Sequence, residues 1–333
     1  RPGPVLIDIP KDITAEKTKY TKLIPKEVVR KSEYITDDVL QEAIELINQS
    51  EKPFIFAGGG VGISEATSEL ISFAEKISAP VSTSLMCMAE FPNDHELYTG
   101  MIGMHGTKAS NIAATKCDLL ITLGARFSDR VISNQNHIKN AKVLQIDVDP
   151  AEIGKVIRTD IPVVADAKDA LEKMLALDTK PGDYSEWIAE CQEREAKHPL
   201  YYDETDEEIK PQRVVEIVGE ITDSKAYVVT DVGQHQIWTA KFWKFSLPMK
   251  FATSGGLGTM GFGMGAALGA KLGNPDSHVL LITGDGSFRM NHPELLTLSR
   301  HNIPITILLF NNSSLGMVRQ WQNLFCNSRY AQT

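Results

Sequence analysis

Short apolar runs that alternate with helical stretches recur along this chain and decide what it can fold into. The run "HVLLITGD" (278–285) is followed by a helical pattern over 292–301 and then by "ITILLFNN" (305–312). Strands that are apolar on both faces are typical of parallel sheets covered by helices on both sides. A strand, a helix and a second strand form a unit whose strands are parallel neighbours. We therefore predict an α/β protein with two open, mainly parallel sheets that carry helices on both faces.

Changes in pattern divide the 333 residues into segments. A helical pattern begins at Asp37, with Thr36 as its expected N-cap. The expected segments are 1–10 as the end of a preceding domain, 11–35 as a charged linker, 36–175 as a first α/β domain, 176–210 as an acidic connector, and 211–333 as a second α/β domain that stops early. Because the chain opens like the last strand of something already under way, we expect it to be a piece of a longer protein.

The expected elements of the two domains come from apolar runs and glycine signals. In the first domain we expect strands in "PFIFAGGGVG" (the strand leading into a glycine loop), "APVSTSL", "CDLLITLGARF" and "AKVLQIDVDP", and a helix in "SEATSELISFAEKISA". In the second domain we expect helices over 212–222, 255–271 and 292–301, with strands in "AYVVTD", "HVLLITGD" and "ITILLFNN".

Composition argues against several classes of protein. The net charge is −9 and the pI is about 5.5, which is the opposite of a nucleic-acid-binding or polybasic membrane surface. The four cysteines are scattered without metal-binding spacing, as in cytoplasmic proteins with reduced thiols: Cys87, Cys117, Cys191 and Cys326. No apolar stretch has the length of a membrane span. We expect a cytoplasmic protein with neither nucleic acid nor membrane as a partner.

The aspartate of "GDG" is the residue that most needs a partner. If the strands before Asp285 and Asn312 are parallel neighbours, both side chains lie at the carboxyl edge of the sheet, where α/β proteins bind ligands. A carboxylate and an amide oxygen suit Mg²⁺, whose other positions go to phosphate oxygens and water. The bland alternative is a glycine turn closed by an aspartate hydrogen bond. The spacing predicts a metal-bridged diphosphate.

These motifs together resemble the catalytic subunit of acetohydroxyacid synthase, also called acetolactate synthase. The stretches that carry the resemblance are "GQHQIW", "SGGLGTMGFGMGAALGA", "NNSSLGMVRQWQ", "GMHGTKASN", "GARFSDR" and "DVDPAEIGK", so it covers essentially the whole chain. That family depends on thiamine diphosphate and has three domains, which bind pyrimidine, FAD and diphosphate. The resemblance implies that this chain holds the end of the first, all of the second and most of the third.

The resemblance implies the ligands of thiamine diphosphate in the second domain. Asp285 and Asn312 would ligate Mg²⁺ through their side chains, and Ser314 would add its backbone carbonyl. Met260 would hold the two rings of the cofactor folded together, although a core methionine is the plain alternative. The complete set of implied contacts is Val232, Gly233, Gln234, His235, Gly258, Met260, Asp285, Gly286, Ser287, Asn312, Ser314, Leu315, Gly316 and Met317.

Two further residues would select the acceptor. Arg130 presents a planar fork suited to a carboxylate and would fix that of a second 2-oxoacid. Trp321 would form one wall of a small apolar pocket. A surface ion pair for Arg130, and interface or core packing for Trp321, are the alternatives. The family has two aspartates where this chain has Ser128 and Asp129.

The resemblance also implies FAD in the first domain. The matching positions are His105, Gly106, Thr107, Gly124, Arg126, Asp147, Asp149 and Asp166. The flavin would be structural, because no electrons move in the net reaction. Catabolic relatives lack these segments, so their presence favours the branch that makes branched-chain amino acids.

The implied reaction is a two-carbon transfer. Pyruvate is decarboxylated on thiamine diphosphate, and the hydroxyethyl unit is condensed with pyruvate or 2-oxobutyrate. The glutamate that activates the cofactor would lie outside this chain, so the isolated piece should be inactive. We expect a homodimer or tetramer with the active site at the dimer interface, and a small regulatory subunit. Another thiamine diphosphate-dependent decarboxylase or carboligase, or a non-catalytic nucleotide-binding partner, are the alternatives.

Overall fold

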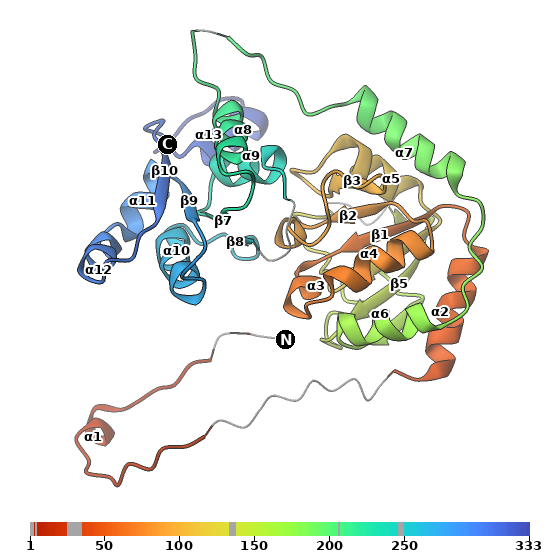
Figure 1. Ribbon diagram of the computed structural model, residues 1–333, viewed down its shortest axis with the longest axis horizontal. Helices are drawn as coiled ribbons and strands as arrows, with labels where there is room; N and C mark the ends of the chain where they lie inside the picture. The colour runs from red at the N-terminus through yellow and green to blue at the C-terminus, as the bar shows by residue number, and fades with distance from the viewer. Residues whose placement is uncertain (1–2, 4, 25–34, 133–137, 206, 246–249) are drawn as a thin grey trace.

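Two parallel sheets, each with helices on both faces, form the body of the protein (Figure 1). The structure is a computed structural model that describes residues 3, 5–24, 35–132, 138–205, 207–245 and 250–333. The first sheet has the strand order β3-β2-β1-β4-β5-β6, the second has the order β10-β9-β7-β8, and every pair of neighbours is parallel. The predicted fold class is confirmed.

The first domain is built on a strand, β1, whose alternate residues face opposite sides of the sheet. Ile55 packs into one buried cluster, and Phe54 and Phe56 pack into another. Thr36 caps the first long helix as predicted, because its side chain accepts a hydrogen bond from the backbone of Val39. The elements are α2 (Asp37–Gln49), β1 (Pro53–Ala57), α3 (Gly59–Ile63), α4 (Thr67–Lys76), β2 (Val81–Thr83), η1 (Leu85–Cys87), β3 (Tyr98–Met101), α5 (Lys108–Lys116), β4 (Leu119–Leu123), β5 (Lys142–Asp147), β6 (Ile161–Val164) and α6 (Ala167–Ala176).

The glycine run after β1 differs from the expected loop. The short helix α3 starts at Gly59, because Gly58 and Gly60 pack directly on the backbone of Gly124 and Ala125 at the end of β4. A side chain at Gly60 would lie 2.6 Å from the Cα of Gly124. The glycines therefore bring two strand ends together rather than form an open loop.

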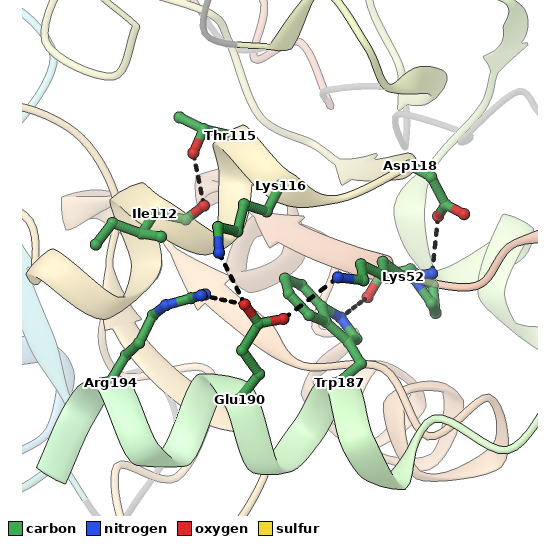
Figure 2. Close-up of polar contacts among 9 residues, drawn as sticks. Lys52, Ile112, Thr115, Lys116, Asp118, Trp187, Glu190 and Arg194 are labelled. Carbon is green, nitrogen blue, oxygen red and sulfur yellow. Dashed lines mark hydrogen bonds and ion pairs between the residues drawn. The ribbon is translucent and has the colours of Figure 1, made fainter.

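Helix α7 (Ser185–Lys197) lies in the segment expected to be a connector and is fastened to the first domain. The Trp187 indole donates a hydrogen bond of 2.9 Å to the carbonyl of Pro53. As Figure 2 shows, the carboxylate of Glu190 meets three cations: Lys116 at 2.9 Å, Lys52 at 3.3 Å, and Arg194 one turn along the helix.

In the second domain, alternate residues of the central strand β9 also face opposite sides of the sheet. Leu280 and Ile282 pack in one buried cluster, and Val279 and Leu281 pack in another on the opposite face. Its elements are α8 (Pro211–Ile221), β7 (Tyr227–Thr230), α9 (Gln234–Phe242), β8 (Phe251–Thr253), α10 (Phe262–Gly273), β9 (Val279–Gly284), α11 (Asp285–Asn291), α12 (Glu294–Arg300), β10 (Thr306–Phe310) and α13 (Gly316–Phe325).

Two boundaries in this domain differ from expectation. The glycine-rich helix was expected over 255–271, yet α10 begins at Phe262, since Gly258 and Gly261 adopt φ values of +76° and +89° that an α-helix cannot contain. The aspartate of "GDG" does not sit in an open turn: Asp285 is the first residue of α11.

The two domains share a buried cluster. Met88 and Met101 of the first domain pack with Val215, Ala240 and Trp243 of the second. Figure 1 shows α9 on the side of the second domain that faces β3. This contact fixes how loops of the first domain stand over the edge of the second sheet.

The expected first segment and linker lie mostly outside these domains. Residues 5–24 contain a short helix, α1 (Lys11–Thr14), and are exposed along their length. Residues 1–2 and 4 of the first segment, and residues 25–34 of the linker, lie outside the described residues. No helix in the described part of the chain is long and apolar enough to cross a membrane.

Removing the charge of Glu190 should loosen α7. The hydrogen bond from Lys116, with smaller contributions from Arg194 and Lys52, lowers the pKa of Glu190 to about 2. Because the folded pKa lies below the unfolded value of about 4.3, the carboxylate stabilises the fold above that pH, and this stability is lost as the pH falls towards 2. We expect Glu190→Gln to lower the free energy of unfolding by about 1 kcal/mol at neutral pH, since the group is partly exposed.

Denaturant unfolding of both proteins from neutral to acid pH checks this, and the difference between them should shrink towards zero on acidification. Glu193→Gln is the control, because Glu193 lies on the same helix and forms its ion pair with the exposed Lys197. Equal stability of wild type and Glu190→Gln at neutral pH would contradict the role given to this cluster.

Candidate active site

The carboxyl ends of β9 and β10 meet in register. Gly284 pairs with Phe310, so Asp285 and Asn311 are the next residues on the two strands, and Asn312 follows. The prediction that "GDG" and "NN" end parallel neighbours is confirmed. Asp285 also stands in the first turn of α11, where the helix dipole favours negative charge.

A cavity of about 560 Å³ opens beside this edge. It is lined by four of the predicted contact residues, namely Gln234, Asn312, Ser314 and Gly316, and by four that the sequence did not single out, namely Arg319, Gln320, Asn323 and Tyr330. Gly316 is the tightest point, because a Cβ there would collide with the amide oxygen of Gln234 and lie 2.9 Å from the amide nitrogen of Asn312. The side chains of Gln234 and Asn312 therefore approach the backbone at the start of α13 closely.

The expected metal ligands lie at this edge with part of their hydrogen-bonding capacity in use. The amide oxygen of Asn312 accepts a hydrogen bond of 3.1 Å from the backbone of Ser314, and the carbonyl of Ser314 accepts one of 2.9 Å from Gly316. The described residues hold no cluster of three or more His, Cys, Asp or Glu side chains that could bind a metal alone. One carboxylate and one amide fit Mg²⁺ when a diphosphate and water complete its shell.

His235 lies beneath the same edge. The side chain is buried, and its ring occupies the space that a side chain at Gly284 or Gly233 would fill. Its Nε2 atom has no hydrogen-bond partner among the described residues. Burial lowers the pKa of His235 to about 4, against the opposing effect of Asp231 and Asp285. An unpartnered ring nitrogen at this depth fits a site that is completed by a polar ligand.

Asp231 is a residue of the site that the sequence analysis missed. It follows β7 directly and is buried, and its two carboxylate oxygens accept hydrogen bonds from the backbone N–H groups of Val232 at 2.8 Å, Gly261 at 2.9 Å and Gly263 at 3.0 Å. The signal was available, because Asp231 follows an apolar strand directly, as Asp285 does, and a glycine stands two residues further on at Gly233. Its carboxylate holds the glycine-rich loop against the strand edge.

The loop held by Asp231 carries Met260 over the start of α11. The methyl group of Met260 lies 3.5 Å from the position of a Cβ on Gly286, and a methyl group of Leu315 lies 3.0 Å from the same point. Ser287 donates a hydrogen bond of 2.8 Å to the carbonyl of Val232. The remaining predicted contacts stand on the same elements: Gly233 precedes α9, Gly258 lies in the glycine-rich loop, and Met317 is in the first turn of α13.

Arg130 and Trp321 come together from different domains. The guanidinium carbon of Arg130 lies 5.8 Å from the centre of the Trp321 ring, which is within the range of a cation–π contact. Arg130 also pairs with its neighbour Asp129 at 2.6 Å, and its side chain is 59% exposed. The surface ion pair weighed for Arg130 is therefore present, alongside the contact that a shared acceptor site would need.

The expected flavin residues occupy loops of the first domain. Thr107 caps α5 and Gly106 closes the turn after β3. Gly124 packs on Gly60, and the guanidinium of Arg126 reaches to within 3.5 Å of the position of a Cβ on Gly256.

The three expected acidic residues support loop backbone at the ends of β5 and β6. Asp147 accepts a hydrogen bond from the backbone of Asp149, Asp149 accepts one from Ala151, and Asp166 caps α6. His105 lines a second, smaller cavity that faces the other domain.

Comparison with known proteins agrees with this geometry. Residues 40–174 match the family described as "Thiamine pyrophosphate enzyme, central domain", and residues 231–333 match "Thiamine pyrophosphate enzyme, C-terminal TPP binding domain". The whole chain is 44% identical to the acetolactate synthase large subunit of Lactococcus lactis subsp. lactis and 47% identical to a probable acetolactate synthase large subunit of Methanocaldococcus jannaschii, and it spans 58% of each of those proteins. It is 42% identical over its whole length to the acetolactate synthase large subunit of Haemophilus influenzae, of which it spans 60%.

Replacing Asp231 tests the support of the glycine-rich loop. Asp231→Asn keeps the shape but turns one acceptor into a donor that faces a backbone N–H group. Leaving a buried donor without an acceptor costs about 1–3 kcal/mol, so we expect a loss of that size in the free energy of unfolding, together with weaker binding of thiamine diphosphate. Chemical denaturation and calorimetric titration of the cofactor measure the two effects. Asp276→Asn, at an exposed position of the same domain, is the control. If the two variants behaved alike, Asp231 would not hold the loop.

Proposed function

We propose that this chain, which belongs to the thiamine pyrophosphate enzyme family, forms the middle and cofactor-binding parts of an acetolactate synthase catalytic subunit. The observation that carries this proposal is the contact between Arg130 and Trp321, which joins the two domains beside the cofactor edge. A general decarboxylase needs one 2-oxoacid site, whereas this pair offers a charged and an apolar group for a second one. The chain spans about three fifths of the curated relatives it matches, so the activity refers to the complete subunit.

Thiamine diphosphate would be held at the edge formed by β7, β9 and β10. Asp285, Asn312 and the carbonyl of Ser314 would bind Mg²⁺, while Gln234 and His235 would meet the diphosphate oxygens. When bound, this cofactor supplies the means to release CO₂ from a 2-oxoacid and to pass on the remaining two-carbon unit. The chain's own residues would bind and orient it: Met260, which lies over the start of α11, would support the folded rings, and Asp231 holds the loop that carries Met260.

Arg130 and Trp321 would divide the recognition of the acceptor between them. The guanidinium would bind the carboxylate that pyruvate and 2-oxobutyrate share. The indole would contact the alkyl end, where these two acids differ by one methylene. Acetolactate and acetohydroxybutyrate are the expected products, which are precursors of branched-chain amino acids.

The first domain would bind FAD in a structural role. The support is the resemblance of its loops to the flavin segments of the resembling family; Arg126 and Thr107 lie in these loops, and Asp147, Asp149 and Asp166 hold loop backbone at strand ends. The visible absorption of the purified complete subunit tests this, and a colourless, fully active protein would contradict it.

The remaining parts of the proposal concern segments and partners beyond these 333 residues. We infer that the glutamate that activates the cofactor comes from another domain of a neighbouring subunit. A homodimer or tetramer would then be the active form, with a small regulatory subunit as an additional partner.

Exchange of the two acceptor residues tests the function. Trp321→Leu should lower the preference for 2-oxobutyrate over pyruvate by about tenfold, since one methylene in an apolar pocket is worth about 1–3 kcal/mol. Arg130→Lys keeps the charge but loses the fork, so it should weaken the use of both acceptors and leave the release of CO₂ from the first pyruvate intact. A competition assay in the complete subunit, with both acceptors present and the two products separated by mass, measures the ratio.

The control is Phe325→Leu, an exposed aromatic residue one turn further along α13 that packs against Trp321. It should leave the product ratio unchanged. An unchanged ratio in Trp321→Leu would remove that residue from the acceptor site, and loss of CO₂ release in Arg130→Lys would move the arginine to the cofactor.

A further inference from the structure

A second cavity, of about 220 Å³, lies between the two domains. His105 reaches it from the loop after β3, Lys241 from α9 and Gln320 from α13. Its apolar wall comes from Ile237, Trp238 and Phe242 of α9 and from Leu200 and Tyr201, which follow α7. The cavity therefore combines a cationic group, amide groups and an apolar, largely aromatic surface, which suits a small molecule with one charged end and one apolar end.

The cavity is lined by the cationic side chain of Lys241 and by the imidazole of His105. Among the residues that the structure describes, no aspartate or glutamate lines it. The Lys241 side chain is half-buried, and within the described part of the chain its ammonium has neither an ion-pair partner nor a hydrogen-bond acceptor. Burial lowers the pKa of Lys241, and the pKa of His105 is lowered by burial and by the nearby charges of Lys241 and Arg130. A partly desolvated ammonium without a counter-charge favours an anion in the space before it.

This cavity shares a wall with the larger one beside the cofactor edge. The amide nitrogen of Gln234 donates a hydrogen bond of 3.2 Å to the amide oxygen of Gln320, and both residues line both cavities. A single hydrogen bond between two neutral side chains contributes only about 1 kcal/mol, so Gln234 and Gln320 can separate at little cost. A molecule held in the smaller cavity is thus one side-chain rearrangement away from the larger cavity.

We propose that the smaller cavity binds the carboxylate of a small aliphatic 2-oxoacid against Lys241, before the acid passes Gln234 and Gln320 to the cofactor. The identification of the anion as a 2-oxoacid rests on the proposed function, while the carboxylate site itself rests on the cavity and its cation. Lys241 binds the carboxylate, which all 2-oxoacids share. It therefore affects the affinity for every 2-oxoacid and not the preference for one over another. In this it differs from Trp321.

Binding without catalysis is the direct test. 2-Oxobutyrate is titrated by ligand-observed NMR into the complete subunit freed of thiamine diphosphate, with 2-butanone as the neutral probe. We expect Lys241→Gln to weaken binding of 2-oxobutyrate by about tenfold, Lys241→Arg to retain most of it, and 2-butanone to show no difference. Lys244→Gln is the matched control, because it removes the same charge at an exposed position just after α9. In turnover, Lys241→Gln should raise KM for both acceptors by the same factor and leave the product ratio unchanged.

Each result separates this site from the proposed activity. Equal affinity of wild type and Lys241→Gln for 2-oxobutyrate overturns the site, whatever products the enzyme forms. Equal weakening by Lys244→Gln also overturns it, because the effect would then be that of surface charge. Binding that depends on Lys241 in a protein that makes no acetolactate supports the site and refutes the function.

Discussion

The parallel pairing of β9 with β10 is the constraint on which the site depends. Because Gly284 pairs with Phe310, Asp285 lies directly beyond one strand and Asn312 lies two residues beyond the other, so a carboxylate and an amide that are far apart in the chain come to one edge. Because β9 is buried along most of its length, the carboxylate that follows it lies at the sheet edge, where backbone amides of helix starts also point. A metal-bridged anion would bind to both the polar side chains and the backbone amides at this edge.

A second carboxylate shapes the same edge from below. The two carboxylate oxygens of Asp231 accept hydrogen bonds from three backbone N–H groups, one of them in the glycine-rich loop and one at the start of α10. These bonds hold the loop in place. Glycine is required there for two reasons: Gly261 has a positive φ, and a Cβ on Gly263 would approach the Asp231 carboxylate at 2.9 Å. The contact between the domains then sets Arg130 beside Trp321, so the relative position of these two side chains depends on packing between the domains as much as on local sequence.

The sequence predicted the features that depend on apolar pattern and chain order. The two parallel sheets, the Thr36 cap and the neighbouring ends of β9 and β10 all follow from runs of apolar residues and short crossovers. The features it could not supply depend on contacts across the fold. The late start of α10 reflects the strand-edge support of its loop, the helix after Gly58 reflects packing on β4, and the cationic cavity at Lys241 exists only because α9 faces the other domain.

The central claim is that Asp285 anchors a metal that bridges the diphosphate to this edge, and calorimetric titration of thiamine diphosphate into the complete subunit tests it most directly. Titrations with saturating Mg²⁺ and with a chelator compare wild type, Asp285→Ala and the exposed control Asp276→Ala. We predict tight, Mg²⁺-dependent binding in wild type and Asp276→Ala, and binding weaker by about a hundredfold and independent of Mg²⁺ in Asp285→Ala, since the variant removes the charged member of the proposed ligand set of Asp285, Asn312 and Ser314. Unchanged affinity and unchanged Mg²⁺ dependence in Asp285→Ala would contradict the account.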